Sequence, residues 1–380
     1  MIQIYSNSLG EEEVNAVREV FASKWLGKGS KEQEFVREVT GKLRTETFEA
    51  GYACPNIKHF ITTNSCTEAA FQLMDLLEIK QGDEVVMPSM SFVGIANAVI
   101  YKGAKVVFCD VDPLTLNPSL EDLKRQITPN TKAIFLIHYA GVPTLELQQI
   151  AEYCTAQGIY LIEDNANSPF ATLDGRSTGL FGDFSIWSFD SMKILVTGDG
   201  GLIYAKNPEH IHKLERQMYL GLETPSGLSN TVDTKWWQFE VSTAGRRSIM
   251  NDITAAIGVE QLKKFSSFIS RRREIYSRYS AELKECSWIT LPNVPTNVSS
   301  SYYMYHVQVD NRDEFAKYLR DKGIYTTFRY YPLHWVDFYK SNIVLPVTNE
   351  VALRTLCLPI HQNLTEEEVD YIIKTIQEWK

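Results

Sequence analysis

The stretch from residue 132 to residue 163 reads KAIFLIHYAGVPTLELQQIAEYCTAQGIYLIE, with two short apolar runs on either side of a longer segment. The runs Lys132–Ile137 and Ile159–Glu163 are rich in Ile and Leu, as is typical of strands buried on both faces. Between them, Leu145–Gln157 has the periodicity of a helix. A strand, a helix and a second strand in this order predict two parallel strands joined by a crossover helix.

The same alternation continues on both sides of this stretch. Further apolar runs occur at Asp83–Pro88, Lys105–Cys109, Phe184–Phe189 and Gly201–Ala205. Helical patterns fall at Thr67–Leu77, Phe92–Tyr101 and Ser119–Gln126. The alternation predicts an α/β protein whose mostly parallel central sheet is covered by helices on both faces. In such sheets ligands bind at the carboxyl ends of the strands, so candidate site residues are sought there.

The two ends of the chain do not show this regular alternation of strands and helices. Two helices are predicted at the start, Gly10–Ser23 and Ser30–Leu43, followed by a loop over 44–58. Asn251–Glu285 reads as one long helix, and a smaller α+β unit follows it. Its expected elements are a strand (Tyr302–Val309), a helix (Arg312–Lys322), an extended segment (Ile324–Tyr331) and a last helix (Thr365–Trp379). At 380 residues we expect two domains, a large one over 1–250 and a small C-terminal one over 251–380.

Composition and charge limit the classes of function. The formal net charge of −9 argues against nucleic acid and anionic membranes as partners, because both are bound by basic surfaces. The six cysteines are scattered without a CxxC pair, which indicates neither a disulfide framework nor a zinc site. There is no signal-peptide pattern and no apolar run long enough to cross a membrane. We therefore expect a cytoplasmic protein.

One lysine follows a predicted strand and precedes a glycine-rich turn. Ser188 is the second-last residue of the apolar run Phe184–Phe189, Lys193 comes five residues after Ser188, and Gly198-Asp199-Gly200-Gly201 follows. A lysine in such a place can hold a carbonyl cofactor as a Schiff base, and a nearby serine hydroxyl can bind a phosphate oxygen. The alternative is a solvated surface lysine, which is far more common.

Four other segments end at the same predicted edge of the sheet. Thr63–Thr67 precedes a helix, where backbone N–H groups point at an anion; the alternative is an ordinary cap by Ser65 or Thr67. Phe92 can stack on a planar ring or belong to the core. His138 is either catalytic or structural. Asp164 ends a strand 29 residues before Lys193, so two adjacent strands would place a carboxylate and an amine on either side of one ring.

The order and spacing of these motifs resemble the DegT/StrS sugar aminotransferase family, which has the fold type I architecture of aspartate aminotransferase. The resemblance covers nearly the whole chain. It rests on WLGKG (25–29), GDEVV (82–86) with PS (88–89), DVD (110–112), EDNA (163–166), GD (182–183), SF (188–189), GDGG (198–201), NDI (251–253) with AAIG (255–258) and YPLH (331–334).

The resemblance implies pyridoxal 5'-phosphate as cofactor and a role for each matching residue. Lys193 would bind the cofactor covalently and move a proton between substrate and cofactor carbons. Asp164 would pair with the pyridinium nitrogen. The other implied contacts are stacking by Phe92, phosphate binding by Ser188 and the amides of Cys66 and Thr67, and contact of Asn167 with the phenolic oxygen. The active sites would be shared in a homodimer, with Arg247 reaching the neighbour's phosphate; Arg246 is the alternative, and so is a pair of solvated surface arginines.

The implied reaction moves an amino group from an amino acid, usually glutamate, to a keto-sugar, commonly a nucleotide-linked 3- or 4-keto hexose for polysaccharide or lipopolysaccharide synthesis. The retained lysine favours transamination over the dehydratase branch, which carries histidine there. Substrate-facing candidates are Asp190, Trp236, Trp237, Tyr330 and His334; many relatives have histidine in place of Asp190. The alternatives are a keto sugar acid without a nucleotide, of the octulosonate type, and a non-catalytic regulator. A nicotinamide dehydrogenase is disfavoured because no GxGxxG follows an early strand.

Overall fold

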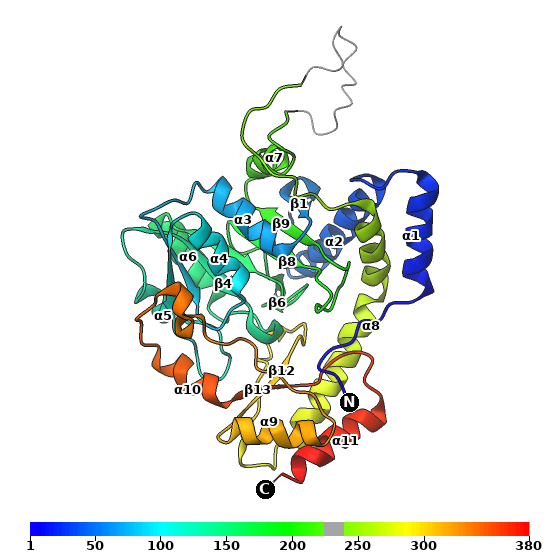
Figure 1. Cartoon of the computed structure of the whole chain (residues 1–380), viewed down its shortest axis with the longest axis vertical. Coiled ribbons are helices and arrows are strands. Elements are labelled where there is room, and N and C mark those ends of the chain that lie inside the picture. Colours follow the sequence, from blue (N-terminus) through cyan, green and yellow to red (C-terminus); the bar gives the residue numbers. More distant parts are fainter. Residues whose placement is uncertain (224–238, 380) are drawn as a thin grey trace.

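A seven-stranded sheet forms the centre of the computed structural model, which describes residues 1–223 and 239–379 (Figure 1). Its strands are β1 (Phe60–Thr63), β2 (Glu84–Pro88), β3 (Lys105–Cys109), β4 (Thr131–Ile137), β5 (Tyr160–Asp164), β8 (Phe184–Ser188) and β9 (Gly201–Ala205). Their order is β1-β9-β8-β5-β4-β2-β3. The five strands from β8 to β3 are parallel, and only the β9 and β1 pairings are antiparallel. The α/β class and the mostly parallel sheet are therefore confirmed.

Helices cover both faces of this sheet. The helices in this part of the chain are α1 (Glu11–Ser23), α2 (Ser30–Glu49), α3 (Cys66–Leu76), α4 (Val93–Tyr101), α5 (Leu120–Lys124), α6 (Leu147–Gln157) and α7 (Pro208–Gln217). Of these, α1 packs on a later helix, against Ile253 and Ala256, rather than on the sheet. Neighbouring strand residues pack into different apolar clusters: Ile203 lies with residues of α3, α4 and α7, whereas Leu202 lies with residues of α2. Because successive strand side chains point to opposite faces, this alternation shows that the sheet is buried on both sides.

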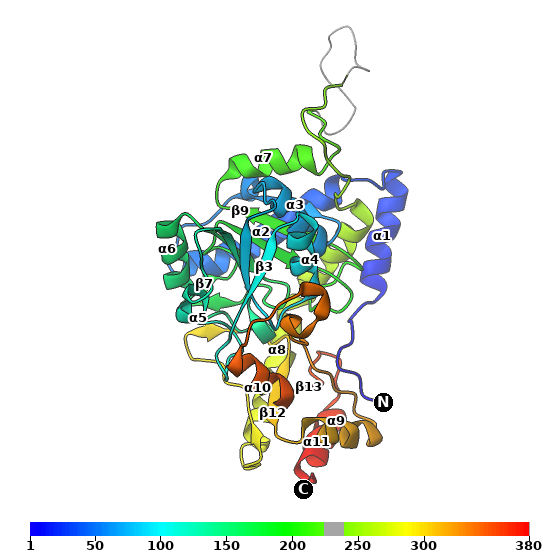
Figure 2. The same cartoon turned by 60° about the vertical axis from the view of Figure 1, so that its left-hand side comes forward.

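A smaller unit follows the central sheet. It contains α8 (Asp252–Glu282), β10 (Ile289–Thr290), β12 (Tyr305–Val309), α9 (Arg312–Asp321), α10 (Pro346–Arg354), β13 (Thr355–Leu358) and α11 (Glu366–Gln377). The strands form an antiparallel sheet in the order β10-β12-β13, with an apolar cluster of its own. Helix α8 runs from beside α1 and α2 down to α9 and α11, where both chain termini lie (Figures 1 and 2). The domain boundary near residue 250 stays a prediction.

Two local predictions differ from the structure. The loop expected over 44–58 is wrong in its first part, because α2 continues to Glu49. Leu43 and Thr47 lie one turn apart and are fully buried against Ser177, whose amide donates to the Thr47 hydroxyl. This tertiary contact extends the helix where the sequence shows no clear period. The segment expected to be extended, Ile324–Tyr331, pairs only through isolated bridges at Ile324 and Thr327.

Three short strands lie outside the two sheets described above. They are β6 (Thr172–Leu173), β7 (Arg176–Ser177) and β11 (Val298–Ser299), which pair in a small antiparallel sheet. Cys109, at the end of β3, is fully buried. Across the ranges 1–223 and 239–379, none of the helices combines the length and the apolar character that a membrane crossing requires.

Candidate active site

The turn after β8 carries Lys193 into the space between the large sheet and the smaller unit. Its amide donates to the carbonyl of Asp190, and the Asp190 carboxylate accepts the amide of Met192 at 2.9 Å. Asp190, predicted to face the substrate, thus supports the turn that presents the lysine. The Lys193 ammonium lies over the ring of Tyr303, 5.1 Å from its centroid. The lysine is half-buried, so it is not an ordinary surface charge.

Asp164 lies at the end of β5, the strand next to β8. It pairs in register with Ile186, which confirms that adjacent strands bring this carboxylate and the lysine turn to one edge of the sheet. Asp164 is buried, and its Oδ1 accepts the amide of Ala166 at 2.9 Å. Burial raises the pKa of Asp164, and the Ala166 amide and the charge of Lys193 oppose that shift. A cation placed beside this buried carboxylate would compensate its desolvation.

Neighbouring groups also shift the pKa of Lys193. Burial alone would lower its pKa, but the attraction of Tyr303, Tyr330 and Asp164 outweighs burial and raises the pKa above the usual range for lysine. These neighbours favour the protonated form of the amine.

Helix α3 begins beside these two groups and offers an anion site. The Ser65 side chain caps the helix by accepting the amide of Glu68 at 3.1 Å, so the preceding amides of Cys66 and Thr67 remain at the helix start. Gly201 approaches this start so closely that a Cβ there would lie 2.8 Å from the Cys66 nitrogen. Ser188 is the β-sheet partner of Gly201, which places it next to the same amides. Free amides at a helix start with a serine hydroxyl beside them are an arrangement that suits a phosphate group.

Aromatic and amide groups lie near the lysine on the remaining sides. Phe92 precedes α4 and is 52% exposed, with its ring centroid 6.4 Å from that of Tyr330. The Tyr330 hydroxyl donates to Asn167 Oδ1 at 3.2 Å. The Asn167 Nδ2 is buried and has no partner among the described residues, so it can donate to an oxygen of a bound molecule.

These features fit pyridoxal phosphate. The orphaned Asn167 donor suits its phenolic oxygen, Asp164 suits its ring nitrogen, the α3 start suits its phosphate, and the exposed Phe92 ring suits its planar face. The structure thus brings together seven of the predicted cofactor and lysine residues in one chain: Cys66, Thr67, Phe92, Asp164, Asn167, Ser188 and Lys193.

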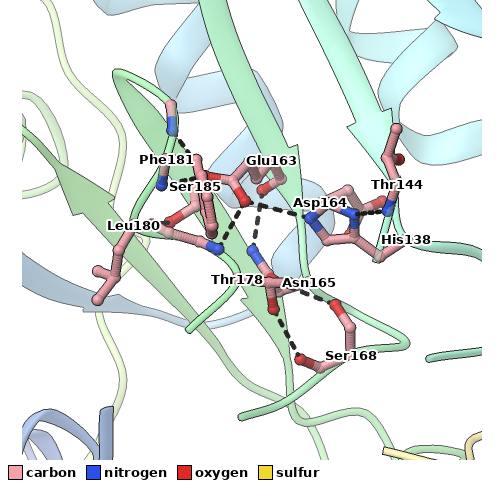
Figure 3. A network of polar contacts seen from close by, with 12 residues as sticks. His138, Thr144, Glu163, Asp164, Asn165, Ser168, Thr178, Leu180, Phe181 and Ser185 are labelled. Atoms are coloured by element: carbon pink, nitrogen blue, oxygen red, sulfur yellow. Dashed lines mark hydrogen bonds and ion pairs between the residues drawn. The ribbon is translucent and has the colours of Figure 1, made fainter. Parts of the chain in front are cut away.

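His138 lies behind this site rather than in it. It is fully buried, with Nε2 3.2 Å from Glu163 Oε2 and Nδ1 accepting the amide of Thr144 (Figure 3). Figure 3 also shows that Glu163 reaches back toward the loop that carries Phe181. Both ring nitrogens are engaged, so of the two interpretations of His138 the geometry favours the structural one.

The remaining predicted residues are not near Lys193 in this chain or are already engaged. His334 is buried, with Nδ1 2.6 Å from Ser89 Oγ and Nε2 2.8 Å from Asn349 Oδ1, which leaves no ring nitrogen for a substrate. Arg247 is exposed, and its guanidinium stacks on Tyr219. Trp236 and Trp237 lie outside the described residues.

Arg246 has two carboxylate partners, in contrast to its neighbour. It forms ion pairs with Glu68 and Asp75, each at 3.0 Å. Arg247 forms no ion pair within the described residues and lines a groove with Trp25 and Ile57. Of the two arginines, Arg247 is therefore the one whose charge is unpaired among the described residues.

Sequence reasoning missed Tyr303 and Arg329, which form the wall of the site beside Lys193. Arg329 donates to the Tyr303 hydroxyl at 2.9 Å. Both residues come from the smaller unit, more than a hundred positions after the lysine, and follow no predicted strand of the large sheet. Only the folded chain shows that they contact the site.

The fold and the site together define a fold type I enzyme that uses pyridoxal phosphate. Residues 7–377 match the model of the DegT/DnrJ/EryC1/StrS aminotransferase family, and the chain belongs to that family. It is therefore a pyridoxal-phosphate-dependent aminotransferase, as the motifs predicted.

Individual relatives agree with this assignment over the full length. The chain is 44% identical over 384 residues to the dTDP-4-dehydro-2,3,6-trideoxy-D-glucose 4-aminotransferase of Saccharopolyspora spinosa, covering 99% of this chain and 96% of the relative. The solved structure of the aminotransferase TlmJ from Streptoalloteichus hindustanus superposes with a TM-score of 0.91 at 42% identity, covering 99% and 98% of the two chains. The PMP form of the putative sugar aminotransferase Spr1654 from Streptococcus pneumoniae superposes with a TM-score of 0.88 at 26% identity, covering 99% and 98%.

Proposed function

We propose that this aminotransferase carries an amino group from an amino acid, glutamate, to the 4-keto carbon of a nucleotide-linked hexose. The observation that carries the transamination chemistry is the placement of Lys193, Asp164 and the α3 start at one edge of the sheet. The hexose is suggested by the relative from Saccharopolyspora spinosa, whose name describes a dTDP-linked 4-keto-sugar. That likeness extends over 99% of the chain, which favours a nucleotide sugar over a keto sugar acid.

The residues of this chain have separate tasks in that reaction. When bound, pyridoxal phosphate supplies an electron sink for the carbanion that forms at the substrate carbon. Lys193 would hold the cofactor at rest, and its Nζ, neutral once released, would take the proton from the α-carbon of the donor and pass it to the cofactor carbon. Asp164 keeps the ring nitrogen protonated because the buried carboxylate favours a cation beside it. Cys66, Thr67 and Ser188 fix the phosphate end.

The site requires a second copy of the chain in this proposal. Arg247 would reach the phosphate of the neighbour in a homodimer, where a guanidinium suits that anion. Arg246 cannot take this part without leaving Glu68 and Asp75. The reaction is proposed for the cytoplasm, where the six free thiols stay reduced.

Absorbance and turnover test the proposal together. Purified protein mixed with pyridoxal phosphate should show a visible band that Lys193→Ala removes and the exposed control Lys317→Ala keeps. The loaded protein should then convert glutamate to 2-oxoglutarate in the presence of a dTDP-4-keto-6-deoxyhexose. A 3-keto isomer and a keto sugar acid complete the panel of acceptors.

Each outcome has a defined meaning. Amination of the sugar acid but not of the nucleotide sugar would replace the proposed acceptor. A wild-type protein without the visible band would contradict the cofactor chemistry itself and favour a regulatory role.

A further inference from the structure

The first eight residues of the chain, here called the N-terminal strap (residues 1–8), connect the smaller unit to the turn that carries Lys193. The strap begins beside the smaller unit and runs toward α1 (Figure 1). At its start, the Ile2 amide donates to the carbonyl of Gly323 at 2.8 Å, and the Ile2 carbonyl accepts the amide of Tyr325 at 2.9 Å. The strap is therefore anchored on the smaller unit at its first residues.

The smaller unit also holds the last residues of the strap. Asn363, just before α11, donates from Nδ2 to the Ser6 hydroxyl and to the Asn7 carbonyl, each at 3.0 Å. Gln261 of α8 donates to the carbonyl of Ser8 at 2.9 Å. These bonds fix the backbone on both sides of Asn7 and so the direction of its side chain.

The side chain of Asn7 reaches the lysine turn. Its Nδ2 donates to the carbonyl of Ser191 at 2.8 Å. Within the turn, the amides of Met192 and Lys193 donate to the carboxylate and the carbonyl of Asp190, both at 2.9 Å. Those two bonds close the turn on itself, whereas the Asn7 amide ties it to a segment far away in the sequence.

A second polar contact between the smaller unit and this turn is weaker. The Tyr303 hydroxyl lies 3.4 Å from the Met192 carbonyl, which is long for a bond from a hydroxyl donor. Asn7 is half-buried, so its shorter bond is partly shielded from competing water. Ile4 and Tyr5 line the same small cavity as Met192, which places several residues of the strap beside the turn.

We propose that Asn7 is a positioning residue for Lys193: its side-chain amide holds the Ser191 carbonyl and thereby fixes the direction in which the amine leaves the turn. This inference rests on the proposed role of Lys193 in the reaction. The amine must bring Nζ to the α-carbon of the donor, and proton transfer tolerates little displacement of the reacting groups. The strap makes the orientation of that amine depend on the smaller unit.

Hydrogen exchange of the protein without cofactor tests the link itself. Asn7→Asp keeps the size of the side chain, but a carboxylate has no donor for the Ser191 carbonyl. Exchange of the Met192 and Lys193 amides, measured by mass spectrometry of the peptide that contains them, should become about 2- to 10-fold faster, the value of one hydrogen bond. Asn7→Gln keeps an amide donor and should recover part of the protection. The same change at an exposed asparagine of α1, Asn15→Asp, should leave the exchange unchanged.

The anchor of the strap gives an independent test. Asn363→Ala removes the donor to the Asn7 carbonyl and should speed exchange of the turn as well. Because both changes open one link, the double variant should exchange within about twofold of the faster single variant. Effects that multiply would show that the two contacts act independently, and the strap would then not connect the smaller unit to the turn.

The donor half-reaction shows whether the link positions the amine. Protein loaded with pyridoxal phosphate is mixed with glutamate, and the loss of visible absorbance gives the limiting rate and the half-saturating glutamate concentration. Asn7→Asp should lower the limiting rate about tenfold or more, because a small displacement of a reacting group is costly. The half-saturating concentration should stay within about twofold of wild type, since the change acts on the lysine turn and not on donor binding.

The two measurements together decide the role of Asn7. Faster exchange with an unchanged limiting rate would mean a merely structural contact and would overturn the proposal, as would unchanged exchange in Asn7→Asp. If wild type shows no visible band, the proposed role of Lys193 falls, and the exchange experiment still decides whether Asn7 holds the turn.

Discussion

The imidazole Nε2 of His138 lies 3.2 Å from a carboxylate oxygen of Glu163, and both side chains are fully buried (Figure 3). Because the other ring nitrogen accepts the amide of Thr144, the proton of a neutral imidazole sits on Nε2 and is donated to Glu163. Glu163 also accepts the amides of Gly179, Phe181 and Gly182 at 2.7 to 2.8 Å. Four donors thus fix the carboxylate immediately before Asp164.

Replacing this carboxylate by an amide should destabilise the fold. In Glu163→Gln one oxygen becomes an NH₂ group, which faces backbone N–H donors and leaves at least one of them unsatisfied. We expect the free energy of unfolding to fall by about 2 kcal/mol, the cost of an unpaired buried donor. Urea denaturation measures it, and Glu285→Gln, whose side chain is 86% exposed, is the control. An unchanged midpoint would show that the network does not stabilise the protein.

Asp164 tests the electrostatic part of the site. Asp164→Asn keeps the size of the side chain but removes the buried charge that pairs with the ring nitrogen. We expect the donor half-reaction to slow about 100-fold or more, as is typical when one electrostatic stabiliser is lost. Cofactor binding should persist, because the phosphate contacts of Ser188 and Cys66 are untouched. Stopped-flow absorbance with glutamate measures the rate, with Asp321→Asn on α9 as control; a rate near that of wild type would remove Asp164 from the reaction.

The residues that sequence reasoning found are those next to strand ends. Asp164 and Lys193 follow two strands that proved to be neighbours, so a spacing of 29 residues was enough to predict their meeting. The bounds of β3 and β9 agree with the predicted apolar runs. For β9 the reason is that a strand buried along its whole length is uninterrupted in hydrophobicity.

What the sequence did not reveal depends on contacts between distant segments. Tyr303 and Arg329 lie beside the lysine only because the smaller unit packs against the large sheet. The periodicity of a short stretch of sequence does not predict such a contact between distant segments. The last turn of α2 is similar, since Leu43 and Thr47 are helical through their contact with Ser177. The hydrogen bonds of His334 and Asp190 could not be predicted from the sequence either. Because these bonds engage the two side chains within the protein, a residue of a family motif need not face the substrate.

A buried histidine in the smaller unit predicts how stability depends on pH. His306 is buried, and burial lowers its pKa from 6.5 to about 4. Between these values the unfolded chain binds a proton that the folded chain does not, so stability falls as pH drops from 6.5 toward 4. Between pH 7 and pH 5 this group should account for a loss of about 2 kcal/mol.

The variant His306→Phe removes that contribution. It keeps an aromatic ring beside Tyr139, so the loss of unfolding free energy between pH 7 and pH 5 should shrink by about 2 kcal/mol relative to wild type. The exposed His212→Gln is the matched control. Urea denaturation at both pH values measures the difference, and an equal pH dependence in His306→Phe and wild type would exclude His306 as its source.

Two adjacent arginines should have separable effects. Arg246 is paired with Glu68 and Asp75 on its own chain, and its side chain is 39% exposed. Arg246→Ala should therefore lower the unfolding free energy by about 1 kcal/mol, the upper range for a partly exposed ion pair, and leave the dissociation constant for pyridoxal phosphate unchanged.

Arg247→Ala should show the reverse pattern. This exposed guanidinium has no carboxylate partner in the described ranges, so its removal should barely change stability. If it reaches the phosphate of the neighbouring subunit, the dissociation constant for the cofactor should rise about tenfold or more, the value of one charge-assisted contact. Fluorescence titration with pyridoxal phosphate measures it, and light scattering shows whether the dimer persists. Weaker cofactor binding in Arg246→Ala but not in Arg247→Ala would assign the phosphate contact to Arg246 instead, at the expense of its two ion pairs.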